Sequence, residues 1–332
     1  MLRPMEQRIL GRTGRSVGVV GLGAWQLGAD WGEVSDADAD AVLDAALDAG
    51  VTFIDTADVY GDGRSEQRCA ALLARRADAG SLFVATKMGR RVDQVPENYN
   101  RENFLAWNDR SRRNLGVEVI DLVQLHCPPT ATYHDDAVFD ALEEMVAAQR
   151  IRSYGVSVET CEQALAAIAR PGVASVQIIL NCLRLRPLEE VLPAAASSGV
   201  AIIARVPLAS GLLSGRYDEH TAFAADDHRN YNRHGESFDV GETFAGVPYG
   251  VGLAAVRELA GVVAPGVAMA QFALRWIIDQ PGVSVVIPGA RSAVQARSNA
   301  AAADLEPLTS EQLSAVREIY DRLVRPYVHE RW

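Results

Sequence analysis

Eight short runs of apolar and β-branched residues alternate with amphipathic stretches, and this alternation limits the folds that the chain can adopt. The runs are too short for helices and are apolar on both faces, which is typical of strands in a covered parallel sheet. They occupy residues 17–20, 53–55, 82–85, 120–125, 154–156, 176–180, 201–204 and 283–287. Helical patterns lie between them at residues 36–49, 65–77, 103–115, 136–148, 160–169, 188–197 and 268–279.

Such an alternation predicts parallel βα units, and eight of them close naturally into a (β/α)8 TIM barrel of the α/β class. An open doubly wound sheet is the alternative that the pattern leaves. Residues 8–15 predict a short β-hairpin ahead of the first barrel strand. Residues 207–250 predict a long loop after strand seven, above the barrel face that carries active sites. Because no linker is visible, we expect one domain over residues 1–332.

Composition removes several classes of function. The 332 residues include 43 acidic and 32 basic side chains, a net charge of -11, which argues against a general nucleic-acid binder. No run approaches the roughly 20 apolar residues of a membrane span, and the first residues do not form a signal peptide. The four cysteines have no metal-type spacing and are expected to be buried thiols. We therefore expect a soluble cytoplasmic protein without a membrane partner.

A glycine pair near the first strand resembles the start of a dinucleotide-binding fingerprint. Gly21 and Gly23 are in place, but Gln26 stands where the third glycine belongs. The pair alone is a weak signal. A turn that leaves the first strand is the simpler interpretation.

Ionisable side chains stand at the ends of three consecutive predicted strands. Asp55 ends strand two, with Tyr60 in the following turn, Lys87 ends strand three and His126 ends strand four. Each could have a structural role alone. Together they are difficult to explain by packing, because a buried carboxylate or ammonium is costly unless it is paired.

This set of side chains suits acid catalysis by a phenol. Tyrosine, with a pKa near 10, is a poor proton donor at neutral pH, and a neighbouring lysine would lower that pKa. An aspartate would hold the lysine, and a histidine could orient a carbonyl oxygen. Acyl transfer is a poor alternative because no activated serine or cysteine accompanies the set. The other histidines show no metal spacing, so we expect no metal site.

Six motifs lie in register with these residues. They are Asp55-Thr56-Ala57-Asp58-Val59-Tyr60-Gly61 with Ser65-Glu66, Thr86-Lys87, Leu122-Val123-Gln124-Leu125-His126, Gly155-Val156-Ser157, Val206-Pro207-Leu208-Ala209-Ser210-Gly211-Leu212-Leu213, and Ile287-Pro288-Gly289-Ala290-Arg291 before Gln295 and Asn299. On these motifs the sequence resembles the aldo-keto reductase superfamily over residues 8–305. The resemblance implies a catalytic tetrad of Tyr60, Asp55, Lys87 and His126, with Tyr60 as the general acid, and an extended NADPH/NADP+ bound across the barrel face.

The resemblance also implies a set of cofactor contacts. Asp55 belongs to them as well as to the tetrad. Arg291 is the expected partner of the 2'-phosphate, with Arg297 as the competing candidate. The remaining implied contacts are Gly23, Ala24, Trp25, Ser157, Gln177, Arg205, Pro207, Leu208, Ser210, Gly211, Leu213, Gln295 and Asn299.

Two positions depart from the family pattern. Val158 stands where many relatives have asparagine, so one carboxamide contact is in doubt. Arg205 stands where many have a tyrosine stacked on the nicotinamide. Its guanidinium would either lie against that ring, disfavouring the cationic NADP+, or turn away and pair with an acidic side chain.

The resemblance implies an NADPH-dependent oxidoreductase that reduces an aldehyde or ketone, a small-molecule carbonyl, to the alcohol. An alternative is a cofactor-binding auxiliary subunit of a membrane channel with little turnover, and a metal-dependent barrel hydrolase is a more remote one. Substrate choice and oligomeric state are outside what the sequence shows. We expect an apolar pocket wall from Trp31, Tyr99, Tyr231, Phe238 and Phe244.

Overall fold

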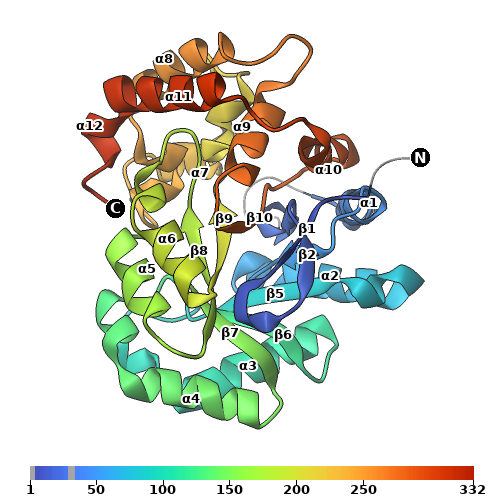
Figure 1. Cartoon of the computed structure of the whole chain (residues 1–332). Coiled ribbons are helices and arrows are strands. Elements are labelled where there is room, and N and C mark those ends of the chain that lie inside the picture. Colours follow the sequence, from blue (N-terminus) through green and yellow to red (C-terminus); the bar gives the residue numbers. More distant parts are fainter. Residues whose placement is uncertain (1–3, 29–33) are drawn as a thin grey trace.

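A ring of parallel strands enclosed by helices forms the body of the protein in a computed structural model that describes residues 4–28 and 34–332 (Figure 1). Within the described residues, one eight-stranded sheet has the order β10-β9-β8-β7-β6-β5-β4-β3. Parallel bridges Val20–Val286 and Gly23–Gly289 join its two ends. This arrangement confirms the predicted (β/α)8 barrel.

The barrel strands are short and buried, as the apolar runs predict. Their bounds are β3 Leu22–Gly23, β4 Phe53–Asp55, β5 Phe83–Met88, β6 Ile120–His126, β7 Ile151–Ser157, β8 Val173–Ile179, β9 Ala201–Arg205 and β10 Val283–Val286. The first strand was predicted too early, at 17–20. Val17 belongs instead to the N-terminal hairpin, because it pairs with Arg8 in the antiparallel strands β1 (Gln7–Ile9) and β2 (Ser16–Gly18).

Seven helices lie within a few residues of the predicted ranges. They are α1 Asp36–Asp48, α2 Arg64–Arg75, α3 Arg101–Leu115, α4 Asp136–Ala147, α5 Cys161–Ile168, α6 Val191–Ser198 and α9 Met269–Ile278. Local signals explain their ends: the Ser35 side chain accepts a hydrogen bond from the Asp38 N–H at the start of α1, and Gly116 ends α3 in the left-handed conformation.

Other helices were not predicted. They are α7 His228–Tyr231, α8 Tyr249–Ala260, α10 Ala293–Ala300, α11 Ser310–Ile319 and α12 Arg325–Val328. α11 has a capping box between Thr309 and Gln312, a signal that is visible in the sequence. α10 packs beside α1, so the outer layer closes where the first and last units meet (Figure 1).

The hairpin closes one end of the barrel. Leu10 and Val17 are fully buried in a cluster with side chains from inside the barrel, Phe53, Phe83, Ala85, Leu122, Ala201, Ile203, Val285 and Ile287. A side chain at Gly11 would collide with the backbone of Ala174 and Ala201, which shows how closely the hairpin approaches the strands. The other end, where the strands terminate, remains available for a site.

The segment after β9 is the long connection that the sequence predicts. It contains 3-10 turns at Ala209–Ser214, Val240–Glu242 and Phe244–Gly246 before α8 begins at Tyr249. In the described part of the chain, no helix is long and apolar enough to cross a membrane. The single domain over 1–332 stays a prediction.

Candidate active site

The four tetrad candidates meet at the C-terminal edge of the sheet. Asp55 is the last residue of β4, Lys87 lies near the end of β5 and His126 ends β6. Tyr60 opens the turn Tyr60–Gly63, and its ring lies edge-on to His126 with ring centroids 5.8 Å apart. The structure therefore brings together all four side chains that the sequence pattern singles out.

The Lys87 ammonium has an acceptor for each of its three protons. Nζ lies 2.5 Å from Asp55 Oδ2, 2.9 Å from the Thr56 carbonyl oxygen and 3.2 Å from the Tyr60 hydroxyl. An ammonium only donates, so the Tyr60 oxygen accepts this bond. The phenol proton is therefore free to point elsewhere.

Burial governs the acid–base properties of this group. Burial raises the pKa of Tyr60, and the opposing effect of Lys87 is smaller, so the net direction is upward. This differs from the expectation that Lys87 would lower the pKa overall, because the sequence could not show how completely the phenol is desolvated. Burial also lowers the pKa of Lys87, but Asp55 and Tyr60 outweigh it and the net direction is upward.

His126 is a neutral imidazole at physiological pH. Burial, together with the charges of Arg90, Lys87 and Arg205, holds its pKa well below the usual value. Its Nδ1 atom is buried and makes no hydrogen bond within the described part of the protein. A neutral ring carries one N–H, which can donate a single hydrogen bond to a carbonyl oxygen.

Two glutamines that point into the barrel support Asp55. Gln177 Nε2 lies 2.8 Å and Gln124 Nε2 3.2 Å from Asp55 Oδ1. The contact of Gln124 with Asp55 was not predicted from the sequence. A signal was present, since Gln124 lies two residues before His126 on the same strand and so shares its face.

The turn that carries Tyr60 requires glycine. Gly61 has φ 60°, and a Cβ there would lie 2.1 Å from the Gly28 carbonyl oxygen. The chain therefore passes directly against the segment after β3. The Thr56 hydroxyl donates to Ser65 Oγ, and Ser65 donates to the Ala24 carbonyl, which fixes this junction further.

A cavity of about 650 Å³ opens beside Tyr60. Its lining includes most of the predicted cofactor residues, namely Gly23, Ala24, Trp25, Asp55, Gln177, Arg205, Pro207, Leu208, Ser210, Gly211, Arg291, Gln295 and Asn299. Arg216, Tyr217, His228, Arg229 and Glu242, which the sequence argument did not select, also line it. Arg297 does not, so of the two candidates for the phosphate only Arg291 faces the cavity.

Two predicted cofactor residues lie outside this lining. Ser157 is buried, with its hydroxyl 3.2 Å from the Cys127 sulfur. Leu213 is buried, and its N–H donates to the Leu208 carbonyl, so it supports the turn Ala209–Ser214.

Arg205 takes the second of its two predicted arrangements. Its side chain lines the cavity, but its guanidinium lies 2.8 Å from Glu159 Oε2 and donates to the Val158 carbonyl at 3.0 Å. Glu242 lies 3.6 Å away on the other side. The fixed positive charge expected against the nicotinamide is therefore paired with carboxylates.

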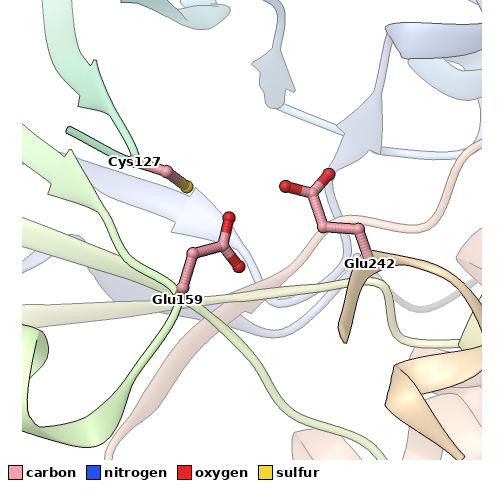
Figure 2. Close-up of side chains that lie close together, drawn as sticks. All are labelled: Cys127, Glu159 and Glu242. Atoms are coloured by element: carbon pink, nitrogen blue, oxygen red, sulfur yellow. The ribbon is translucent and has the colours of Figure 1, made fainter. Parts of the chain in front are cut away.

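The two carboxylates that pair with Arg205 lie close to a cysteine, and together the three side chains offer atoms of the kind that bind metals. Cys127, Glu159 and Glu242 point toward one another (Figure 2), and one ligand atom of each lies within 4.8 Å of the others. Arg90 contacts both carboxylates, at 2.9 and 2.8 Å, and Arg205 contacts them as well. Positive side chains thus balance these carboxylates, and the cluster is an ion-pair network.

The expected aromatic wall does not form: none of its four described residues, Tyr99, Tyr231, Phe238 and Phe244, lines the cavity. Trp25 lines the cavity and contacts the rings of Tyr60, His228 and Phe238. Tyr99, in contrast, packs against Phe104 and Trp107. Phe244 packs against Phe223 and Tyr249, and Tyr231 packs against Phe238, whose ring also contacts Trp25 and His228 of the lining. Trp31 lies outside the described residues.

Comparison with known proteins identifies the class of oxidoreductase to which this barrel belongs. The chain belongs to the aldo/keto reductase family, whose family model matches residues 19–321.

Individual relatives cover most of the chain. The aldo-keto reductase YhdN of Bacillus subtilis is 30% identical over 291 residues, 86% of this chain and 85% of that protein. The solved structure of the glycerol dehydrogenase AKR11B4 from Gluconobacter oxydans has a TM-score of 0.76 and 30% identity, and the match covers 93% of each chain. The probable voltage-gated potassium channel subunit beta of Arabidopsis thaliana is 26% identical over 321 residues, 92% of this chain and 93% of that protein.

Proposed function

We propose that this protein is an NADPH-dependent reductase that converts an aldehyde or ketone to the alcohol, with Tyr60 as the proton donor. One observation carries the proposal. All three protons of the Lys87 ammonium have acceptors, one of them the Tyr60 oxygen, so the phenol proton is free to donate to a ligand in the cavity that Tyr60 lines. A donor held in this way suits a carbonyl oxygen.

The cavity fits an extended dinucleotide. Gly23, Gly211 and Gly289 line it without side chains, so a ligand can approach the backbone closely. Arg291 stands directly before α10, whose N-terminus favours an anion, and arginine suits a phosphate. We assign the 2'-phosphate to Arg291, and the adenosine end to Gln295 and Asn299.

In this proposal a bound NADPH supplies the hydride, and the protein supplies the proton and the geometry. Tyr60 donates its proton to the carbonyl oxygen. Lys87 stabilises the phenolate that remains, and Asp55 holds Lys87 while Gln124 and Gln177 hold Asp55. His126, neutral and buried, donates a hydrogen bond that orients the carbonyl.

A carbonyl screen with NADPH, followed through the nicotinamide absorbance, tests the proposal. Tyr60→Phe should keep NADPH affinity within a few fold and lose about 100- to 10,000-fold in turnover. Near-normal turnover in this variant would remove Tyr60 as the general acid.

A cofactor-binding auxiliary subunit is the second candidate, and the likeness to the plant channel subunit is the observation that favours it. Such a subunit would bind NADPH and show little turnover with every carbonyl. The same screen separates the two, since binding without turnover favours the subunit. All four cysteines are free thiols, which supports our proposal of a reducing, cytoplasmic setting.

A further inference from the structure

Four charged side chains from separate parts of the chain form a closed network beside the cavity. Arg90 follows β5, Glu159 follows β7, Arg205 ends β9, and Glu242 belongs to the turn Val240–Glu242 in the long loop. Each arginine contacts both carboxylates, at distances between 2.8 and 3.6 Å. The Glu159 and Glu242 carboxylates approach each other from opposite sides (Figure 2).

The network is balanced in formal charge, with two guanidinium groups and two carboxylates. Burial raises the pKa of Glu242, but Arg90 and Arg205 outweigh it and bring the pKa down to about 2. Burial, with the neighbouring Glu242 adding to it, raises the pKa of Glu159; Arg205 and Arg90 oppose this only in part, so the net direction is upward. Arg205 and Glu242 line the cavity, so the net charge of this network acts on a ligand bound there.

The chemistry of hydride transfer places the nicotinamide ring near this network. The carbonyl oxygen must reach Tyr60, and the hydride must reach the adjacent carbon at about 3–3.5 Å. A bound ring would therefore have to lie within a few ångströms of Tyr60. Glu242 is close enough for its charge to act on the Tyr60 phenol.

We propose that Glu242 and Glu159 cancel the charges of Arg205 and Arg90, and thereby keep the cavity from favouring the neutral reduced ring over the cationic oxidised ring. This inference rests on the proposed function. Arginine alone would repel NADP+, as the sequence argument expected. In the paired network that bias is suppressed, so the enzyme retains comparable affinity for both forms.

Because Glu242 lies in the long loop after β9, the charge balance of the network depends on the conformation of that loop. The Ser210 hydroxyl donates to the Glu242 carbonyl at 3.1 Å and accepts from the Phe244 N–H. The same segment also contacts Trp332. The Trp332 Nε1 atom donates a hydrogen bond to Asp239, and the Trp332 ring packs against Gly246. Glu242 is thus a positioning residue that supplies a fixed counter-charge.

Dissociation constants for NADP+ and NADPH, measured by calorimetry on the full chain, test the inference. Glu242→Gln leaves one uncompensated positive charge, which at about 8 Å and an effective dielectric constant near 40 should raise the Kd ratio of NADP+ to NADPH roughly fivefold. Arg205→Gln should lower the ratio by a similar factor. The double variant, again neutral, should return within about twofold of wild type.

Glu236→Gln is the matched control, because Glu236 is an exposed residue of the same loop and is not part of the network. It should leave the ratio unchanged. Glu159→Gln makes the same change of charge as Glu242→Gln and replaces it if that variant does not fold.

An unchanged ratio in the folded glutamate variant, or shifts of the same sign for the glutamate and Arg205 variants, would overturn the inference. If wild type binds neither cofactor, the proposed function itself fails. Binding of both with ratios that do not move refutes only the charge balance.

Discussion

Asp58 carries a buried carboxyl group that should make the stability of the protein depend on pH. Its side chain is fully buried two residues before Tyr60, and neither oxygen makes a hydrogen bond of normal geometry within the described residues. Burial, with Glu66 adding to it, raises its pKa from 3.8 to about 7, and Arg91 and Arg110 oppose this only in part. We predict that Asp58→Asn stabilises the protein at alkaline pH.

The sign and size follow from linkage. Below about pH 4 the carboxyl is protonated in both the folded and unfolded states and contributes nothing. Between about pH 4 and 7 the unfolded chain ionises while the folded protein holds its proton, so stability falls as the pH rises. The rise from 3.8 to about 7 corresponds to about 4 kcal/mol. Side-chain relaxation and water entry reduce this, so we expect about 2 kcal/mol at pH 8.

Urea unfolding of wild type and Asp58→Asn at pH 4.5 and pH 8 measures the effect, because the two values lie near the two ends of the range in which the folded and unfolded carboxyl groups differ in protonation. The difference in unfolding free energy should be small at pH 4.5 and favour the variant at pH 8. Asp62→Asn is the control, because Asp62 is exposed and Arg91 lowers its pKa. Its substitution should lower stability slightly at pH 8.

Two results would contradict this reasoning about Asp58. One is a stability difference that is the same at both pH values, which would indicate a packing effect. The other is an Asp58→Asn variant that is less stable than wild type at pH 8, which would mean that the ionised carboxylate has favourable partners.

Three further predictions concern the cofactor end, the loop and the tetrad. Arg291→Ala should weaken NADPH binding roughly 10- to 150-fold and spare NADH, and equal loss for both in titrations would show that Arg291 does not contact the phosphate. Trp332→Ala should lower the free energy of unfolding in urea by about 3 kcal/mol and open the 239–246 segment to protease, whereas Tyr327→Ala, at an exposed site, should change the stability by less than about 0.5 kcal/mol. Lys87→Met should cost about 3–5 kcal/mol in the same unfolding assay because Asp55 loses its partner, and adding Asp55→Asn should recover part of the loss.

The clustering of the four tetrad candidates could be predicted from the sequence because parallel topology brings strand ends together. Asp55, Lys87 and His126 each lie at or near the end of a strand, and the register places these strands side by side in the order β4, β5 and β6. A polar residue at the end of an apolar run is therefore already assigned to one edge of the barrel. The same reasoning applies to Gln124, which lies two residues before His126 on the same face of β6.

The first strand was misplaced for a physical reason. The run 17–20 is apolar because Val17 fills the end of the barrel from the hairpin, and Val20 then bridges to Val286. An apolar run indicates that its residues are buried, but it does not distinguish a segment that closes the end of the barrel from a barrel strand. The strand itself, Leu22–Gly23, is too short to form a pattern.

The partners of Arg205 could not be predicted from the sequence. Glu159 follows a strand, and Glu242 lies in a loop without hydrophobic periodicity, so nothing in their local sequence marks them as neighbours of Arg205. Loop geometry decides which carboxylate reaches a given arginine. The orientation of a long charged side chain is therefore determined only when the whole loop is in place.

These pairings also bear on how the site would select its cofactor. Among the buried charges near Tyr60, Lys87 pairs with Asp55 and the arginines of the network pair with Glu159 and Glu242, whereas Asp58 makes no hydrogen bond of normal geometry within the described residues. Burial is the largest influence on the pKa of Tyr60, and Lys87 opposes it only in part. Discrimination between NADPH and NADH must then arise where the two differ, at the 2'-phosphate. We propose that Arg291, which lines the cavity directly before α10, exerts it.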